Sequence, residues 1–219
     1  RGGRRAAREP ARHARAGRLV LPAPRHHVPM RRQRVGCDES CAPRLVEASA
    51  IRSITEFGPL TVHLVRGSSH RFHAVWKQTL DRYHYLGSGF LCGAQLRYVV
   101  LAGEHVVAAV SFSSAALKVG ARDEFIGWSQ AARQRNRSLV ISQSRFCLKV
   151  HEKNLASRIQ SMLLSRVARD WLEIFGRKPV LVESYVDSSR FKGTSYRASN
   201  WKLVGQTAGR GRQDREHRG

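Results

Sequence analysis

Short runs of β-branched and apolar residues recur along the chain and are separated by polar turns. Residues 60–65, LTVHLV, alternate between apolar and polar positions, which is the period of a half-buried strand. Residues 94–115 contain two valine-rich runs around Ala-Gly-Glu-His and predict a β-hairpin. Three further strands are predicted over residues 138–150, 178–186 and 200–207.

A second pattern, with apolar residues three or four positions apart, predicts helices between these strands. Residues 68–86 begin with a serine cap and show this spacing. Residues 152–176 carry the strongest helical pattern and close on a glycine. Residues 122–136 predict a short helix or loop, and residues 187–199 predict a helix capped by Asp187.

The predicted order is strand, helix, hairpin, strand, long helix, strand, helix and strand. A strand, a long helix and a second strand in succession are typical of a parallel crossover connection. The chain is therefore expected to be an α/β protein, with a mixed sheet flanked by helices.

Charge divides the chain into three parts. The first 34 residues contain eleven of the 39 basic residues and one of the 16 acidic residues, which leaves a net charge of +13 on the rest. We expect residues 1–57 to be a basic, irregular N-terminal segment and linker, residues 58–208 to be the folded domain, and residues 209–219 to be a basic flexible tail. Because the chain begins with arginine rather than methionine, we expect a piece of a longer protein.

The net charge of +23 predicts an anionic partner. Membrane binding favours a basic helix with aromatic anchors, and the first 34 residues contain no aromatic residue. We therefore predict a nucleic acid partner, with DNA expected, and no membrane. The sequence shows no long apolar run, no secretory signal and four irregularly spaced cysteines, which favours the cytoplasm. No metal site is predicted, because Cys37 and Cys41 lack a second ligand pair.

Glu183 stands in an otherwise apolar strand, where a carboxylate requires a partner. We expect Arg145 to be that partner. Glu183 is also a candidate general base, because burial raises the pKa of a carboxyl group. The structural ion pair and the catalytic role are both left open.

His84 lies between two tyrosines at the predicted end of a helix. It is a candidate catalytic base or metal ligand, and Tyr83 and Tyr85 are candidates for stacking on nucleic acid bases. The alternative is that Tyr83 belongs to the core and that His84 caps the helix.

Several arginines are candidates for phosphate contacts. Arg122 and Trp128 could bind a phosphate and a base, and the alternative is an ion pair of Arg122 with Asp123 over an exposed ring. The further nucleic-acid-binding candidates are Arg145, Arg190, Arg210 and Arg212.

Tyr196, Asn200, Trp201 and Gly205 follow one another at the spacing of a helix that leads into a last strand. This stretch resembles the end of the Gcn5-related N-acetyltransferase (GNAT) fold. The resemblance implies a GNAT-like sheet and a Tyr196 that acts as a general acid toward the departing thiolate of coenzyme A. On the predicted helix, Phe191 and Ala198 are expected to pack inward, so that the Tyr196 hydroxyl faces the gap between the two preceding strands.

The same resemblance points to acyl coenzyme A as a candidate cofactor. In the GNAT fold its pyrophosphate lies on a turn at the N-terminus of the long helix, where free backbone N–H groups favour an anion. Asn154, Ala156 and Ser157 occupy that turn here.

Several motifs occur together in one order along most of residues 58–213. They are RYHYLG (82–87), RDEFIGWS (122–129), SRFCL (144–148), NLAS (154–157), PVLVESYVD (179–187) and RFKGTSYRASNWKLVGQTAGRGR (190–212). Together they resemble the DruA family of the Druantia anti-phage system, whose relatives accompany transposase genes. Residues 16–25 resemble the end of that family's winged-helix-like N-terminal region.

These observations predict a DNA-binding, GNAT-like domain that acts in anti-phage defence or mobile-element biology. The first alternative is a transferase that modifies a base or another acceptor on nucleic acid. The second is a non-enzymatic scaffold that docks a helicase or transposase. The sequence leaves open whether the protein is an enzyme.

Overall fold

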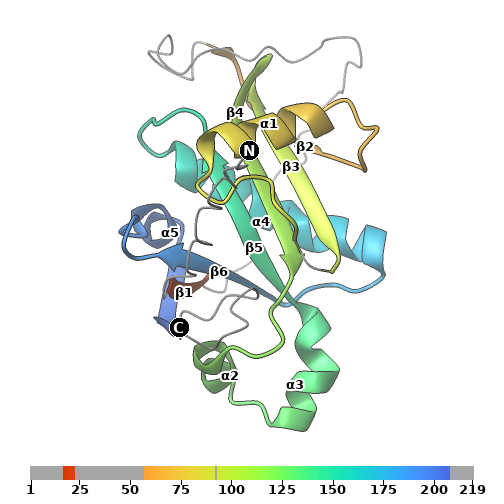
Figure 1. The fold of residues 1–219 in the computed structure, drawn as a ribbon, viewed down its shortest axis with the longest axis vertical. Coiled ribbons are helices and arrows are strands. Elements are labelled where there is room, and N and C mark those ends of the chain that lie inside the picture. Colours follow the sequence, from red (N-terminus) through yellow and green to blue (C-terminus); the bar gives the residue numbers. More distant parts are fainter. Residues whose placement is uncertain (1–16, 23–56, 92, 208–219) are drawn as a thin grey trace, which may run out of the picture.

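The computed structural model describes residues 17–22, 57–91 and 93–207, which contribute seven strands to one sheet (Figure 1). The strand order is β2-β3-β4-β5-β6-β1-β7. The strands are β1 (Gly17–Pro22), β2 (Leu60–Leu64), β3 (Gln95–Ala102), β4 (His105–Ser114), β5 (Val140–Leu148), β6 (Leu181–Asp187) and β7 (Trp201–Gln206). The helices are α1 (His73–Tyr83), α2 (Gly120–Ile126), α3 (Gln130–Asn136), α4 (Leu155–Phe175) and α5 (Thr194–Ala198), and a 3-10 turn, Arg137–Leu139, precedes β5.

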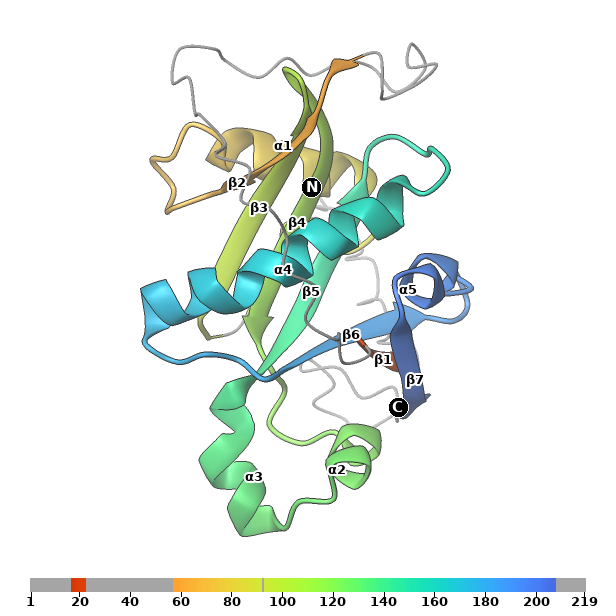
Figure 2. The same cartoon turned by 180° about the vertical axis from the view of Figure 1, so that it is seen from behind.

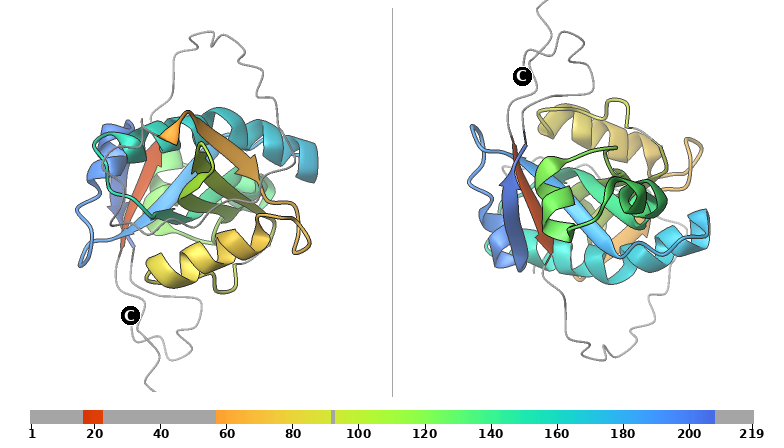
Figure 3. Two further views of the ribbon diagram at one scale, coloured as in Figure 1. Left: turned by 90° about the horizontal axis from the view of Figure 1, so that it is seen from above. Right: turned by 90° about the horizontal axis from the view of Figure 1, so that it is seen from below.

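Helices α1 and α4 cover opposite faces of the sheet (Figures 2 and 3). On the α4 face, Ile159, Leu163 and Val167 pack on alternate residues of β3 and β4 such as Val100 and Phe112. The α1 face has its own core, which contains the following residues: Phe72, Trp76, Leu80, Val99, Ala109 and Cys147. Burial of apolar side chains on both faces explains why β3 and β4 read as nearly continuous apolar runs.

The predicted α/β architecture with a mixed sheet flanked by helices is confirmed. Helix α4 connects β5 to β6, which pair in parallel, while the other neighbouring strands pair antiparallel. The segment expected to be a short helix or loop contains two helices, α2 and α3. Among the described helices, none is long and apolar enough to cross a membrane.

Strand β1 was not predicted, because it lies in the segment expected to be irregular. It pairs antiparallel with both β6 and β7 and separates these two strands. Its position against β6 is given by the register Gly17↔Asp187 to Val20↔Ser184. The pairing joins residues far apart in the sequence, so the local pattern could not indicate it.

Strands β5 and β6 part after a short paired stretch. They pair from Val140↔Leu181 to Gln143↔Ser184 and then diverge (Figure 2). The divergence coincides with a β-bulge, since Ser144 has no partner between the β4–β5 pairs Phe112↔Gln143 and Ser111↔Arg145. A bulge bends the strand that contains it and ends regular pairing. The sheet is therefore open on one side of β5.

The predicted helix over residues 187–199 is wrong in its first half. Asp187 ends β6, and its side chain accepts hydrogen bonds from the Ser189 backbone N–H (3.0 Å) and hydroxyl (2.6 Å). Such a side-chain turn competes with helix formation. The helix begins only after Gly193, and the residue that it buries is Tyr196. Phe191 and Ala198, which were expected to pack inward, are exposed.

Tyr196 lies edge-on against Trp201, with ring centroids 5.0 Å apart, and both side chains are buried. Asn200, between α5 and β7, adopts the left-handed conformation with φ of 60°. Gly205 permits a close approach of α2 to β7, because a Cβ there would lie 2.7 Å from the Cβ of Ala121. Asn200, Trp201 and Gly205 therefore have clear roles in the fold.

A buried ion pair attaches α2 to β6. Both Arg122 and Glu183 are fully buried, and Arg122 Nη1 lies 3.3 Å from Glu183 Oε2. Arg122 also donates to the Ala116 carbonyl (3.0 Å) and to Asp123 Oδ1 (3.0 Å), while the Tyr185 hydroxyl donates to Glu183 Oε1 (2.8 Å). Several hydrogen bonds thus compensate the two buried charges, and Arg122 Nη2, which makes no hydrogen bond of its own, lies 3.0 Å from Asp123 Oδ1.

The expected pairing of Glu183 with Arg145 is wrong. Arg145 Nε donates to the Gly87 carbonyl (2.9 Å) and Nη1 to the Ser144 carbonyl (2.8 Å). The bulge at Ser144 and the divergence of the strands separate Arg145 from Glu183. The sequence pattern did not define the helix that contains Arg122, so it could not indicate Arg122 as the partner of Glu183.

Arg122→Met should destabilise the protein by about 3–5 kcal/mol, because it leaves the Glu183 carboxylate buried without its partner. The double variant Arg122→Met/Glu183→Leu should recover most of that loss. Arg145→Met is the matched arginine control and should cost less than Arg122→Met. Urea unfolding of these variants, of Glu183→Leu alone and of the unmodified protein measures these free energies, and additive effects of the two substitutions at 122 and 183 would contradict the pairing.

Candidate functional site

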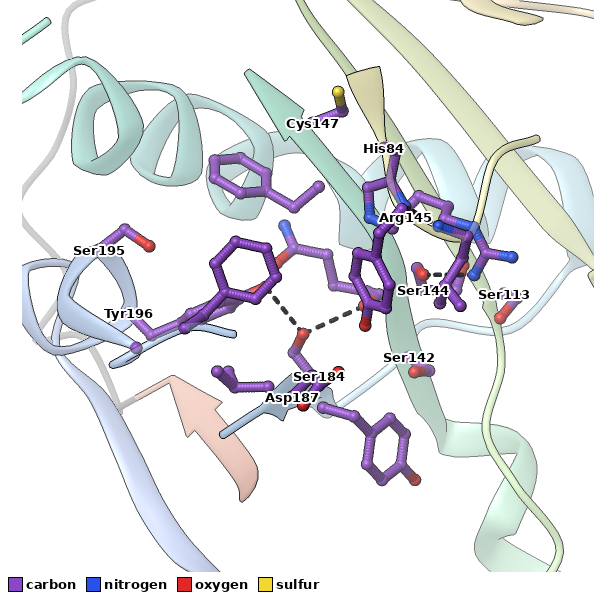
Figure 4. Close-up of a pocket in the computed structure, with 18 of the residues that line it drawn as sticks. His84, Ser113, Ser142, Ser144, Arg145, Cys147, Ser184, Asp187, Ser195 and Tyr196 are labelled. Atoms are coloured by element: carbon purple, nitrogen blue, oxygen red, sulfur yellow. Dashed lines mark hydrogen bonds between the residues drawn. The ribbon is translucent and has the colours of Figure 1, made fainter. Parts of the chain in front are cut away.

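A cleft of about 1600 Å³ opens where β5 and β6 part (Figure 4). Its walls come from β5, the end of β4, the end of β6 and the loop that follows α1. The loop after β4, the 3-10 turn at Arg137, the turn after β6, helix α5 and the segment before α4 also line it. The bulge in β5 and the turn at Asp187 therefore shape the cleft directly.

Basic side chains outnumber acidic ones around this cleft. The basic residues are Lys118, Arg137, Arg145, Arg190 and Lys192, and the carboxylates are Glu152 and Asp187. Asp187 Oδ2 lies 3.5 Å from Arg190 Nε, so one of the two carboxylates already faces a cation. A concave surface lined by one sign of charge concentrates ions of the opposite sign. The cleft is thus suited to an anionic ligand.

Arg145 is a half-buried cation that faces the cleft. Its two hydrogen bonds go to backbone carbonyls, and no carboxylate among the described residues pairs with it. Burial lowers the pKa of the guanidinium, with Tyr85 opposing that effect. A half-buried cation without a carboxylate partner carries a desolvation cost that a bound anion would offset.

Aromatic rings lie beside these cations. The Arg190 guanidinium lies 5.0 Å from the centroid of the Tyr85 ring, and Phe191 lies 5.8 Å from the same ring. Half of the Phe191 side chain is exposed. Rings beside arginines are the kind of surface on which nucleic acid bases stack.

His84 lines the cleft, stacked on Tyr85 with ring centroids 4.9 Å apart. Burial, and secondarily the charge of Arg145, lower the pKa of His84 to about 4. Its Nδ1 accepts a hydrogen bond from the Leu86 backbone N–H (3.2 Å), so in the neutral ring Nε2 carries the proton. Its own backbone N–H caps α1 at the Leu80 carbonyl. The described residues contain no cluster of metal-binding side chains.

Tyr196 reaches the cleft from α5, and its hydroxyl lies 2.9 Å from Ser184 Oγ on β6 (Figure 4). The hydroxyl therefore does face the region between β5 and β6, as expected. Burial raises the pKa of Tyr196 to about 12, while hydrogen bonding to Ser184 opposes the shift. The phenol is protonated at neutral pH. Its role as a general acid stays a prediction.

Glu183 lies outside the set of residues that line the cleft. Burial raises its pKa, and the charge of Arg122 and the Tyr185 hydroxyl counteract the rise. Since neighbouring residues in a strand face opposite sides, Glu183 points away from Ser184 and toward α2. A catalytic role for Glu183 stays a prediction, with its structural role now evident.

The candidate phosphate contacts fall into three groups. Arg145 and Arg190 line the cleft. Arg122 is fully buried, so a phosphate cannot reach it, and Trp128 donates to Asp123 Oδ1 (3.0 Å) in the same internal network. The expectation that Arg122 contacts nucleic acid is therefore wrong. Arg210 and Arg212 lie outside the described residues.

The candidate cofactor turn fits a pyrophosphate poorly. Asn154 adopts the left-handed conformation, with φ of 63°, but the Leu155 backbone N–H donates to the Glu152 carbonyl (3.2 Å). The Ser157 hydroxyl donates to the Asn154 carbonyl (2.9 Å). Of the three candidates, only Ala156 lines the cleft. The turn thus uses its own polar groups, and no step is assigned to acyl coenzyme A.

Sequence reasoning missed several residues of the site. These are Lys118, Arg137, Gln143, Ser184 and Lys192. The sequence does carry a signal for Gln143 and Ser184, because they are polar positions within the otherwise apolar strands at 138–150 and 178–186. Each strand has a glutamine or serine at the point where the two strands part.

Acidification should expose the cost of burying His84. Between about pH 6.5 and 4 the unfolded chain binds a proton at this imidazole that the folded chain excludes. The neutral, buried His84 side chain therefore makes its full contribution to stability above about pH 6.5, and this contribution is lost as the pH falls toward 4. His84→Asn, which keeps an acceptor near the Nδ1 position, should show a smaller fall in Tm between pH 7 and pH 4.5. His151→Asn, an exposed residue of the same cleft, is the control, and equal slopes for all three proteins would contradict the burial of His84.

Comparison with curated proteins finds no significant match, and comparison with solved structures finds none either. A family model, described as Druantia protein DruA, matches residues 13–217. That match spans β1, the sheet, the cleft and β7, and it includes every motif on which the resemblance was based. It indicates a component of an anti-phage defence system, and the chain belongs to the DruA family.

Proposed function

We propose that this chain binds nucleic acid, with DNA as the expected ligand, through the cleft between β5 and β6. The observation that carries the proposal is Arg145, a half-buried guanidinium that faces the cleft without a carboxylate partner among the described residues. An anionic phosphate supplies the missing charge. Membership of the DruA family supports a role for such binding in anti-phage defence.

The distribution of charge supports this proposal. Five basic side chains line the cleft against two carboxylates, and the chain as a whole carries a net charge of +23. Neutralising phosphates with lysine and arginine releases bound counterions, which drives association with nucleic acid of any sequence. The rings of Tyr85 and Phe191 add surfaces for stacking.

The arrangement also supports a GNAT-like scaffold, as part of this proposal. A long helix crosses between two parallel strands, the strands diverge after four paired positions, and a tyrosine on a following short helix faces the gap. Tyr196 on this short helix belongs to the stretch that carries the GNAT resemblance of the sequence, and the parallel pairing and divergence of the strands add to it. In this scaffold the divergence provides the cleft, whichever ligand occupies it.

Binding should depend steeply on salt, with a log–log slope of about −0.9 per phosphate neutralised on duplex DNA. Arg145→Gln should weaken binding and make the slope shallower by about one phosphate contact. Arg66→Gln is the matched control, because Arg66 has the same charge but lies exposed beside Glu173, away from the cleft. Fluorescence anisotropy at several salt concentrations measures both quantities. A flat salt dependence, or an equal loss in both variants, would overturn the cleft as the binding site.

A transferase is the second candidate function. The observation that favours it is the Tyr196 hydroxyl, which faces the cleft and whose pKa of about 12 keeps it protonated. A phenol held in this state can donate a proton to a leaving group. The same hydroxyl shares a hydrogen bond with Ser184. If that bond is the only role of the hydroxyl, substitution of Tyr196 or of Ser184 should have a similar effect.

Tyr196→Phe keeps the ring and removes one hydrogen bond, which should cost about 0.5–1.5 kcal/mol of stability. Ser184→Ala removes the same hydrogen bond from the other side and measures what the loss of that bond alone does to stability and protection. If Tyr196 is a proton donor, only Tyr196→Phe should abolish protection against phage in cells that carry the complete defence system. A fully protective Tyr196→Phe protein would exclude the proton-donor role.

A further inference from the structure

The floor of the cleft is a neutral polar network built from four elements of the fold. Ser184 Oγ donates to the Gln143 carbonyl (3.1 Å) and lies 2.9 Å from the Tyr196 hydroxyl (Figure 4). Gln143 Nε2 lies 3.5 Å from Gln160 Oε1. Strands β5 and β6 and helices α4 and α5 thus each contribute one side chain. None of these four side chains carries a charge at neutral pH.

This network is incomplete within the described residues. Gln143 Oε1 has no hydrogen-bond partner, although Gln143 is 3% exposed. The amide of the fully buried Gln160 interacts with the Tyr196 hydroxyl, although its Nε2 lacks a well-formed hydrogen bond. If both amides were flipped, one donor and one acceptor would still be left over. Burying a polar atom without a partner is costly, so such atoms usually mark a place that a ligand or solvent fills. Gln143 is among the residues that line the cleft, so its unpartnered amide oxygen lies at the cleft floor.

Charged groups lie close to this neutral floor. Arg145 follows Gln143 by two positions on β5, but the bulge at Ser144 lies between them. Gln143 faces Gln160 of α4, whereas Arg145 faces Gly87 of the loop after α1. A ligand that spans the gap between the strands would place a neutral polar group on the floor and an anionic group beside Arg145. Ser113 and Ser142 add hydroxyl groups to the same surface (Figure 4).

A nucleotide has this composition. Its base is a flat neutral ring with hydrogen-bond donors and acceptors at its edge, and its phosphate is an anion. Tyr85 and Phe191 in the cleft wall offer rings against which a base can stack. The cleft, at about 1600 Å³, exceeds the roughly 300–1,000 Å³ of ordinary small-molecule pockets. That size favours a segment of a polynucleotide over a free nucleotide.

We infer that the cleft floor is a base-binding subsite that takes the base of an unpaired nucleotide in a DNA strand. Gln143, supported by Gln160, binds the edge of the base, and Arg145 and Arg190 hold neighbouring phosphates. A paired base cannot present its Watson–Crick edge to this floor, so the site selects single-stranded or unpaired DNA. The inference deepens the proposed function and rests on it.

Two single strands of roughly 12 nucleotides, within the site sizes usual for such grooves, test the subsite. One is oligothymidylate, and the other is a strand of abasic deoxyribose phosphates with the same length and charge. The 219-residue chain should bind the abasic strand at least about tenfold more weakly. Both strands should show the same salt dependence, because they carry the same phosphates.

Gln143→Met keeps the length of the side chain and removes its hydrogen-bonding atoms. It should weaken binding of oligothymidylate by roughly three- to tenfold and leave binding of the abasic strand unchanged. Gln206→Met, an exposed glutamine of β7 outside the cleft, is the matched control and should bind both strands as the unmodified protein does. Gln160→Met provides a second test of the network if Gln143→Met fails to fold.

Equal, salt-dependent affinity of the unmodified protein for both strands would overturn the base subsite while leaving the proposed function standing. Equal losses of Gln143→Met on both strands would overturn the role of the amide. If thymidine 5′-monophosphate binds as tightly as the strand, the ligand is a free nucleotide and the polynucleotide occupant is wrong. No binding of either strand at low salt would overturn the proposed function as well.

Discussion

The ion pair between Arg122 and Glu183 holds together the parts of the molecule that enclose the cleft. Glu183 lies in the short stretch where β6 still pairs with β5, and Arg122 comes from α2, which packs on β7 at Gly205. Neighbouring residues of a strand point to opposite faces. The ion pair that fixes Glu183 on one face therefore fixes Ser184 on the other, where it contacts Tyr196. A pair of buried charges is a weak source of stability, and its clearest effect here is to fix the position of β6 relative to α2.

The opening of the sheet follows from a single extra residue. Ser144 has no partner in the β4–β5 register, and the next positions of β5 no longer pair with β6. Without this bulge, β5 and β6 would continue side by side and their backbones would hydrogen-bond across the gap. With it, Arg145 and Gln143 point to opposite faces of an opened sheet. The same irregularity thus creates the cavity and divides it into a charged part and a neutral part.

Local patterns in the sequence predicted the elements whose causes are local. The hairpin of β3 and β4 and the amphipathic helix α4 were found because their apolar spacing is complete within each segment. Strand β1 was missed because only its pairing with β6 and β7 makes it a strand. The turn at Asp187 was read as a helix cap because the same side chain satisfies either structure, and the hydrogen bonds to Ser189 decide between them.

The candidate site was predictable only in part for the same reason. Tyr196, Arg145, His84 and Arg190 were identified as unusual residues, and the structure brings them to one cleft. The partner of Glu183 could not be identified, because the sequence offers many arginines and Arg122 is 61 residues away. Gln143 and Gln160 were overlooked because a glutamine in a strand or helix is ordinary until the fold places it in the interior.

The protonation states of the cleft favour binding over proton transfer. His84 is neutral at physiological pH, with a pKa of about 4, and its Nδ1 accepts the Leu86 N–H. The free ring nitrogen is therefore a donor, whereas a general base needs an available acceptor. Asp187 accepts from Ser189 and faces Arg190, so its carboxylate serves the turn after β6. Apart from Glu152, the groups left to meet a ligand are cations and neutral hydrogen-bonding side chains. Such a set suits the phosphate and the base edge of the proposed ligand, and it leaves Tyr196 as the side chain in the described cleft best suited to supply a proton.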